Sequence, residues 1–165
     1  RFGAQMPAVL NYIAGNWNVA GTFVYRTGQY FAPTFSGVDP SNTNLRSGRA
    51  DRIADGNLSG GGTVDRWFDT DAFVRPAASI GRFGTSGAFV VEGPRMDVFH
   101  FGLMKEVPIR ERFRLKLEMV STNFFNHPNF SNPSAVVGTS TYGKVLSTIS
   151  TDGNRNFQLT ARLLF

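Results

Sequence analysis

The end of the chain places apolar side chains at every second position over Phe157 to Phe165. The apolar set is Phe157, Leu159, Ala161, Leu163 and Phe165, and the residues between them are Gln158, Thr160, Arg162 and Leu164. Only Leu164 departs from the alternation with polar residues. A period of two predicts a β-strand with one apolar and one polar face. Whatever this chain folds into must therefore cover one face of an extended terminal segment.

Three earlier segments share this period. The alternation is clearest after Phe113, where Phe113, Leu115, Leu117 and Met119 alternate with Arg114, Lys116 and Glu118. We expect an all-β fold in which four long antiparallel strands follow one another as a meander. Their expected ranges are 16–31, 95–107, 113–126 and 154–165. A short charged turn is expected at Pro108 to Arg112 between the second and third strands.

The rest of the chain carries turn chemistry. Residues 32–94 are rich in dipeptides such as Asp39-Pro40, Asp55-Gly56 and Gly93-Pro94, and show no sustained period. We interpret them as one long loop with local structure, and residues 127–152 as a second loop. Residues 1–15 have helix-like spacing through Met6, Val9, Leu10 and Ile13 and are expected to be a short connector.

Strand length favours a membrane over a soluble core. Eight residue steps, from Trp17 to Tyr25 or from Phe157 to Phe165, cover roughly 26 Å at about 3.3 Å per residue. A tilt of about 40° leaves about 20 Å along the membrane normal, close to the apolar band of about 25 Å, flanked by aromatic girdles, in outer-membrane barrels. A 63-residue loop is unusual inside a compact soluble domain but expected outside such a barrel. A soluble or secreted β-sandwich that binds a ligand remains the alternative.

Four strands cannot close a barrel, because an open edge in lipid leaves backbone groups unpaired. The chain begins at Arg1 without the pattern of a signal peptide. We therefore expect a C-terminal fragment, with further strands before Arg1.

Composition argues against several other functions. The net charge of +5 comes from scattered Lys and Arg residues, so we do not expect nucleic-acid binding. The chain has no cysteine, and its only histidines, His100 and His127, lie on different expected elements and in no metal or catalytic motif. We therefore predict no enzyme activity, no bound metal and no cofactor.

One cluster in the long loop has the chemistry of a ligand contact. Arg66, Trp67 and Asp69 combine an aromatic ring with charges, which suits a sugar or a peptide. The same residue types also order loops, and we favour that interpretation. Asp51 and Asp55 similarly suggest a calcium loop, but Ile53 stands where an oxygen ligand belongs, so a turn is favoured.

Charged residues of the strands form another set. If the apolar sides of the strands face lipid, the polar sides face the barrel lumen. The set expected there is Arg26, Arg114, Lys116, Glu118 and Arg162. Simple solvation of these charges is the alternative, and the sequence does not choose between the two.

The sequence resembles the C-terminal end of TonB-dependent outer-membrane receptors of the Oar-like branch. The resemblance rests on "GNWNVAGTFVYRTGQYF", "GRADRIADGNL", "DRWFDTDAFV", "GRFGTSG", "VPIRERFRLKLEMVSTNFFNHPNF" and "FQLTARLLF", in the expected order over nearly the whole chain. "NFFNHPNF", Asn123 to Phe130, resembles the end of the penultimate strand in such receptors.

This resemblance implies a 22-stranded barrel in the outer membrane of a Gram-negative cell, filled by an N-terminal plug and energised by the TonB complex. The plug and the TonB-contacting segment are absent from these residues. Residues 1–15 would then be periplasmic, and residues 32–94 extracellular. The terminal set from Phe157 to Phe165 resembles the signal read by the barrel assembly machinery. The implied function is energised uptake of a ligand that the sequence does not identify.

Overall fold

The computed structural model describes residues 8–110, 112–149 and 153–165 of the 165-residue chain. Its internal contacts divide the chain into two units, which we call the sheet unit and the loop unit. The sheet unit takes in the described residues of Arg1–Tyr25, Asp97–Pro128 and Ser150–Phe165. The loop unit takes in Arg26–Met96 and Asn129–Ile149.

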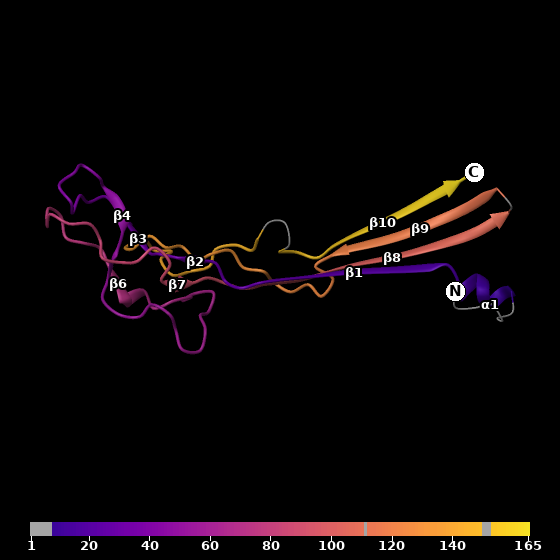
Figure 1. Ribbon diagram of the computed structural model, residues 1–165, viewed down its shortest axis with the longest axis horizontal. Coiled ribbons are helices and arrows are strands. Elements are labelled where there is room, and N and C mark those ends of the chain that lie inside the picture. The colour runs from indigo at the N-terminus through magenta and orange to yellow at the C-terminus, as the bar shows by residue number, and fades with distance from the viewer. Residues whose placement is uncertain (1–7, 111, 150–152) are drawn as a thin grey trace. The chain divides into compact units, whose positions relative to one another are not determined.

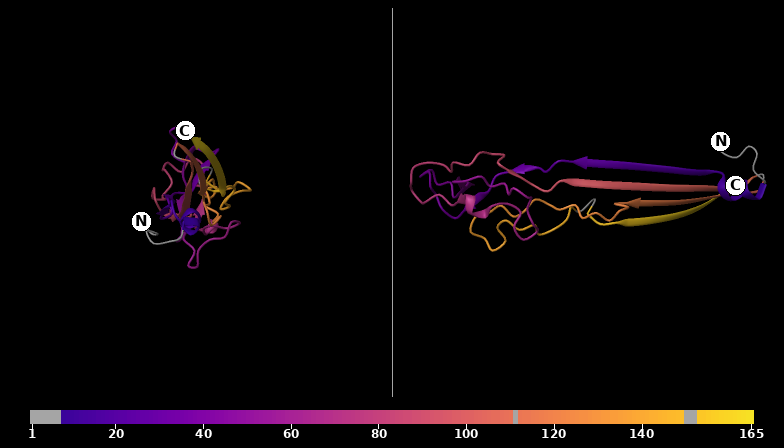
Figure 2. Two further views of the ribbon diagram at one scale, coloured as in Figure 1. Left: turned by 90° about the vertical axis from the view of Figure 1, so that its right-hand side faces the viewer. Right: turned by 90° about the horizontal axis from the view of Figure 1, so that it is seen from below.

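Four long strands make up the sheet. They are β1 (Trp17–Arg26), β8 (Met96–Arg110), β9 (Phe113–Thr122) and β10 (Asn156–Leu164). Their order in the sheet is β1-β8-β9-β10, and β9 pairs antiparallel with both β8 and β10. Figures 1 and 2 show the four strands side by side. The expected all-β meander of four long strands is confirmed.

Two of the expected strands end several residues earlier in the structure. β9 ends at Thr122 instead of continuing to 126, because Asn123 has a positive φ of 46° and leaves the extended conformation. The Asn123 side chain holds the turn that follows: its Nδ2 donates to His127 O at 2.7 Å, and its Oδ1 accepts from His127 N at 3.0 Å. "NFFNHPNF" therefore begins just after the penultimate strand. β1 also stops early, at Arg26, and Tyr30 and Phe31 pair elsewhere as β2.

The turn expected at Pro108 to Arg112 is shorter in the structure. β8 continues to Arg110, and Pro108 lies opposite Arg114 in the ladder with β9. The register shifts between Pro108 and Arg110, as in a β-bulge. A bulge is a site where a proline inside a sheet is tolerated, because the ladder hydrogen bond there is already interrupted.

The helix-like spacing near the start of the chain corresponds to α1 (Ala8–Ala14), which leads into β1. Met6, part of the expected apolar stripe, lies outside the described residues. Leu10 and Ile13 are 53% and 64% exposed. Within the described ranges, no helix is both long enough and apolar enough to cross a membrane.

The loop unit is built from short ladders. β2 (Tyr30–Phe31) pairs with β7 (Val91–Glu92), β3 (Thr34–Ser36) with β4 (Ser47–Arg49), and β5 (Asp51–Arg52) with β6 (Phe73–Val74). A 3-10 turn, η1 (Thr70–Ala72), precedes β6. Residues 129–149 join these ladders through backbone hydrogen bonds, for example from Trp67 N to Gly143 O and from Val145 N to Val64 O, both at 2.8 Å.

A small hydrophobic core holds the loop unit together. Its buried members are Ala50, Phe68, Ala72, Phe73 and Val91. The Phe68 side chain is 1% exposed, and its ring meets those of Phe31, Phe73 and Tyr142 edge to face at 5.7, 6.1 and 5.3 Å. Such pairs add to the free energy gained by burying the rings. The segment interpreted as one long loop is thus a packed unit that also needs residues 129–149.

Candidate functional site

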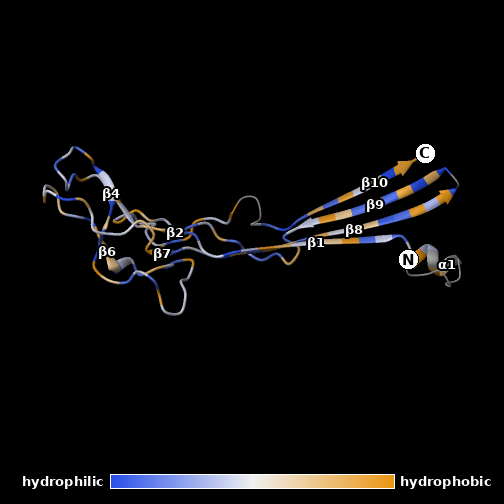
Figure 3. Ribbon diagram, viewed as in Figure 1, coloured by the Kyte–Doolittle hydropathy of each residue, from blue (hydrophilic) through white to orange (hydrophobic). Residues whose placement is uncertain are grey.

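The sheet has two chemically different faces, because residues directly opposite each other in a ladder point to the same side. Met119 lies opposite Leu103 on one side and Leu159 on the other. The odd-numbered residues of β8, β9 and β10 therefore share one face. β1 follows the same parity, because a Cβ added to Gly21 would meet the Phe99 ring at 2.9 Å. Figure 3 shows the resulting alternation of hydropathy along the strands. We call the odd-numbered side the apolar face and the even-numbered side the charged face.

The charged face brings together four of the five residues predicted to face a lumen: Arg114, Lys116, Glu118 and Arg162. Lys116 lies opposite both Arg162 and Glu106. Arg114 Nη1 is 3.1 Å from Glu106 Oε1, and Lys116 Nζ is 3.8 Å from Glu118 Oε2. Sequence reasoning missed Glu106, which the cross-strand register adds to this row.

The fifth predicted residue, Arg26, is placed differently. It ends β1, and its Nη2 donates to Met96 Sδ at 2.7 Å, also at the end of a strand. Its role at a lumen remains a prediction.

The β10 residues predicted as an assembly signal lie on the apolar face. Leu163, Ala161 and Leu159 are opposite Leu115, Leu117 and Met119. Leu159 is 78% exposed, and Phe165, which follows β10, is 94% exposed. On β1 the same face exposes 63% of Val19 and 65% of Phe23. Extended apolar surface of this kind marks contact with a membrane or another protein.

Aromatic side chains mark two ends of the apolar face. At one end a cluster combines Phe99, Phe101, Phe124, Phe125 and Phe157. The Phe99 and Phe125 rings stack at 5.3 Å, and the Phe101 and Phe124 rings lie 5.0 Å apart. At the other end Trp17 begins β1, and its Nε1 donates to Ile13 O at 2.9 Å. Aromatic belts at two levels are typical of strands that cross a membrane.

The loop unit contains a separate pocket of about 430 Å³, which we call the loop pocket. Its polar and aromatic lining includes Tyr30, Asn57, Trp67, Glu92 and Arg95. Trp67 Nε1 donates to Glu92 O at 3.0 Å, and Tyr30 Oη donates to Glu92 Oε2 at 3.3 Å. Asn57 Oδ1 accepts from Glu92 N at 3.1 Å, so the wall is fixed by hydrogen bonds from three segments. The volume lies within the range of about 300–1,000 Å³ common for ligand sites.

Of the three predicted ligand contacts, Trp67 lines the loop pocket, while Arg66 and Asp69 do not. Arg66 Nη2 lies 2.5 Å from Asp69 Oδ1 and 3.4 Å from Asp71 Oδ2. The Asp69 side chain also caps η1 by accepting from Asp71 N at 3.3 Å. Sequence reasoning missed four other residues of the pocket lining, because their positions lie far apart along the chain. They are Tyr30, Asn57, Glu92 and Arg95.

The acidic residues suggested as a calcium loop are held by protein groups. Arg82 donates to Asp51 from Nη1 and Nη2 at 2.6 and 2.9 Å, and the Thr85 amide donates at 3.0 Å. The hydrogen bond from Arg82 is the main cause that lowers the pKa of Asp51. Asp55 instead holds a turn by accepting from Asn57 N at 3.2 Å. Among the described residues, no group of three His, Cys, Asp or Glu side chains is placed to hold a metal ion.

Comparison with known proteins identifies a family. A family model described as an outer membrane beta barrel domain matches residues 1–158. No curated protein and no solved structure matches the chain. The matched range includes α1, the loop unit, β1, β8, β9 and the first residues of β10.

Proposed function

Because the chain belongs to the outer membrane beta barrel domain family, we propose that it is part of a TonB-dependent receptor of the Oar-like branch that takes up a ligand across the outer membrane. In this proposal the four long strands are wall strands of a larger barrel. The apolar face contacts lipid, and the charged face with Arg114, Lys116, Glu118 and Arg162 contacts the lumen or a plug. The chain carries no catalytic step of its own.

The observation that carries the proposal is the combination of a two-faced sheet with a packed loop unit that has a pocket. The family already accounts for a protein located in the outer membrane. It does not account for the core around Phe68 or for the loop pocket, which simple connecting loops do not need. A pocket with three aromatic rings and both signs of charge supports recognition of a ligand.

The alternative of a soluble β-sandwich loses its support. A sandwich needs two packed sheets whose inner faces form a common core. The long strands here form one sheet, and among the described residues β1 is exposed along nearly its whole length. In the proposed receptor, residues 1–15 are periplasmic and residues 32–94 are extracellular.

Ligand recognition by the loop pocket is testable on the purified full-length protein in detergent. A panel of oligosaccharides and short peptides should contain a compound that binds with measurable heat. Tyr30→Ala should then weaken binding by about 30-fold, because loss of an aromatic anchor costs about 2 kcal/mol. Tyr30 is 47% exposed, so the loop unit should remain folded.

Arg66→Ala is the control, since Arg66 lies outside the pocket lining. An Arg66 variant as impaired as the Tyr30 variant would place the ligand elsewhere on the loop unit. Cells should also take up the bound compound only when TonB is present. Unchanged uptake without TonB contradicts the energised mechanism.

The role of the chain end in assembly is tested by deleting Phe165 from the full-length protein. The residue is 94% exposed and stabilises little by packing in the described structure. We therefore expect its loss to lower the amount of protein in the outer membrane without unfolding the loop unit. Abundance and heat-modifiable migration in gels measure this, and wild-type levels of both contradict the assembly role.

A further inference from the structure

Lys105 lies on the apolar face, opposite Leu117 in the β8–β9 ladder. The residue is nevertheless 7% exposed, because α1 covers it. Lys105 Nζ donates to Tyr12 O and to Ile13 O, both at 2.9 Å, and also to Gly15 O. An ammonium group has three N–H donors, so these three carbonyl groups use all of them. The donors of the ammonium group are thus satisfied within the sheet unit.

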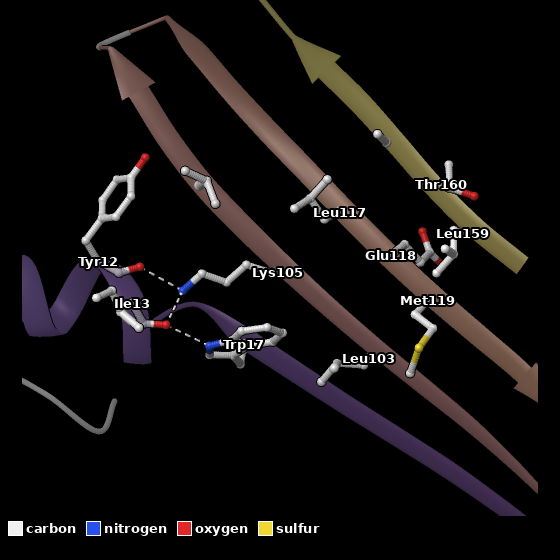
Figure 4. A pocket seen from close by; sticks show the side chains of 12 residues that line it. Tyr12, Ile13, Trp17, Leu103, Lys105, Leu117, Glu118, Met119, Leu159 and Thr160 are labelled. Atoms are coloured by element: carbon white, nitrogen blue, oxygen red, sulfur yellow. Dashed lines mark hydrogen bonds between the residues drawn. The ribbon is translucent and has the colours of Figure 1, made fainter. Parts of the chain in front are cut away.

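Two of the carbonyl groups that Lys105 binds, those of Tyr12 and Ile13, belong to the C-terminal end of α1, and the third is that of Gly15, just after the helix. The last carbonyl groups of a helix have no partner inside it, and a cation is favourable there. Trp17 completes the arrangement: its Nε1 shares Ile13 O with Lys105, and its ring lies 5.0 Å from Lys105 Nζ. Figure 4 shows these side chains together, with the lysine reaching from β8 to α1. Lys105 therefore fastens α1 to the apolar face.

Between α1 and the apolar face lies an open groove of about 620 Å³, which we call the α1 groove. Its lining includes Ile13, Trp17, Leu103, Leu117, Met119 and Leu159. The groove lies over the face of the sheet and is lined by side chains of β8, β9 and β10. With the Lys105 donors already used, the groove offers no free ammonium group to an anion.

We propose that the α1 groove binds an acyl chain of a membrane phospholipid, and that Lys105 is the positioning residue that holds α1 as one wall of this site. The protein belongs to an outer-membrane family, so hydrocarbon is the apolar partner available to this face. Tyr12 and Trp17 suit the membrane–water boundary, because each has an apolar ring with one polar tip. The inference rests on the outward orientation of the apolar face in the proposed function.

The test titrates the full-length protein, in micelles of a detergent that is not a phospholipid, with a phosphatidylcholine that carries a photoactivatable diazirine in its acyl chain. After irradiation, peptide mass spectrometry locates the adducts. We expect adducts at Leu103, Leu117 and Leu159 that saturate with probe and are competed by unlabelled phosphatidylcholine. Val19 and Phe23, exposed on the same face, serve as the comparison for ordinary lipid contact. The amount of adduct at Val19 and Phe23 should increase with the probe concentration without reaching a plateau.

Lys105→Met should abolish the saturable adducts and leave those at Val19 and Phe23 unchanged, whereas Lys105→Arg should retain them. Val107→Phe, which fills the groove without touching the lysine contacts, should also abolish them and provides a second test should the Met variant fail to assemble.

The outcomes separate this site from the proposed function. Equal, unsaturable adducts at all five positions overturn the lipid site but leave the outward orientation intact. A lack of adducts at all five overturns both. Saturable adducts that survive Lys105→Met overturn the positioning role of the lysine, and saturable adducts that survive Val107→Phe overturn the groove as the binding site.

Discussion

Replacing Phe68 with alanine should destabilise the loop unit by about 3–5 kcal/mol, the usual cost of removing a buried phenylalanine. The ring is 1% exposed and sits between those of Phe31, Phe73 and Tyr142, so its loss leaves a cavity at the centre of the core. Hydrogen exchange of the full-length protein measures the effect. The Val145 amide donates a hydrogen bond to Val64 O, and its exchange with solvent should become at least about 100-fold faster. This follows because 1.4 kcal/mol corresponds to a factor of ten.

Phe89→Ala is the matched control, because Phe89 belongs to the same unit but is 77% exposed. It should change the exchange rates little. The two variants lose the same atoms, so their difference reports burial alone. Similar protection in both variants would mean that the loop unit does not depend on this core, and the loop pocket would lose its structural basis.

Replacing Leu159 with arginine should cost about 2–4 kcal/mol of membrane-inserted stability, the range for a cation on the lipid side near the middle of a bilayer. Leu159 lies near the centre of β10 on the apolar face and is 78% exposed. In a water-soluble protein, such an exposed leucine would tolerate arginine with little loss. Urea unfolding of the full-length protein in lipid vesicles, followed by heat-modifiable migration, gives the difference in the free energy of unfolding.

Thr160→Arg supplies the control at the neighbouring position. Thr160 lies on the charged face, opposite Glu118, so an arginine there finds polar surroundings and should cost little. The two variants introduce the same side chain one residue apart. Because a one-residue slip exchanges the faces of a strand, a larger cost at 160 than at 159 means that the charged face meets the lipid.

The sequence alone determined the strands and their two faces. Side chains of a strand alternate strictly, so the apolar period from Phe157 to Phe165 and from Phe113 to Met119 identified both the elements and the residues that share a face. The order of the four strands followed as well, since neighbouring antiparallel strands need only a simple return of the chain. The residues at which strands end were harder to predict from the sequence. The side-chain hydrogen bonds of Asn123 and the bulge after Pro108 depend on residues outside the repeating pattern.

Only the tertiary structure decided which distant residues meet. The register of β8 against β9 places Glu106 beside Lys116 and Lys105 on the apolar side, a position that its own charge does not predict. The loop pocket joins Tyr30, Trp67 and Glu92, and the loop core joins Phe31, Phe68 and Tyr142. Local periodicity carries no information about such contacts. They follow from which loop closures bury enough apolar surface to offset the entropy of ordering the chain.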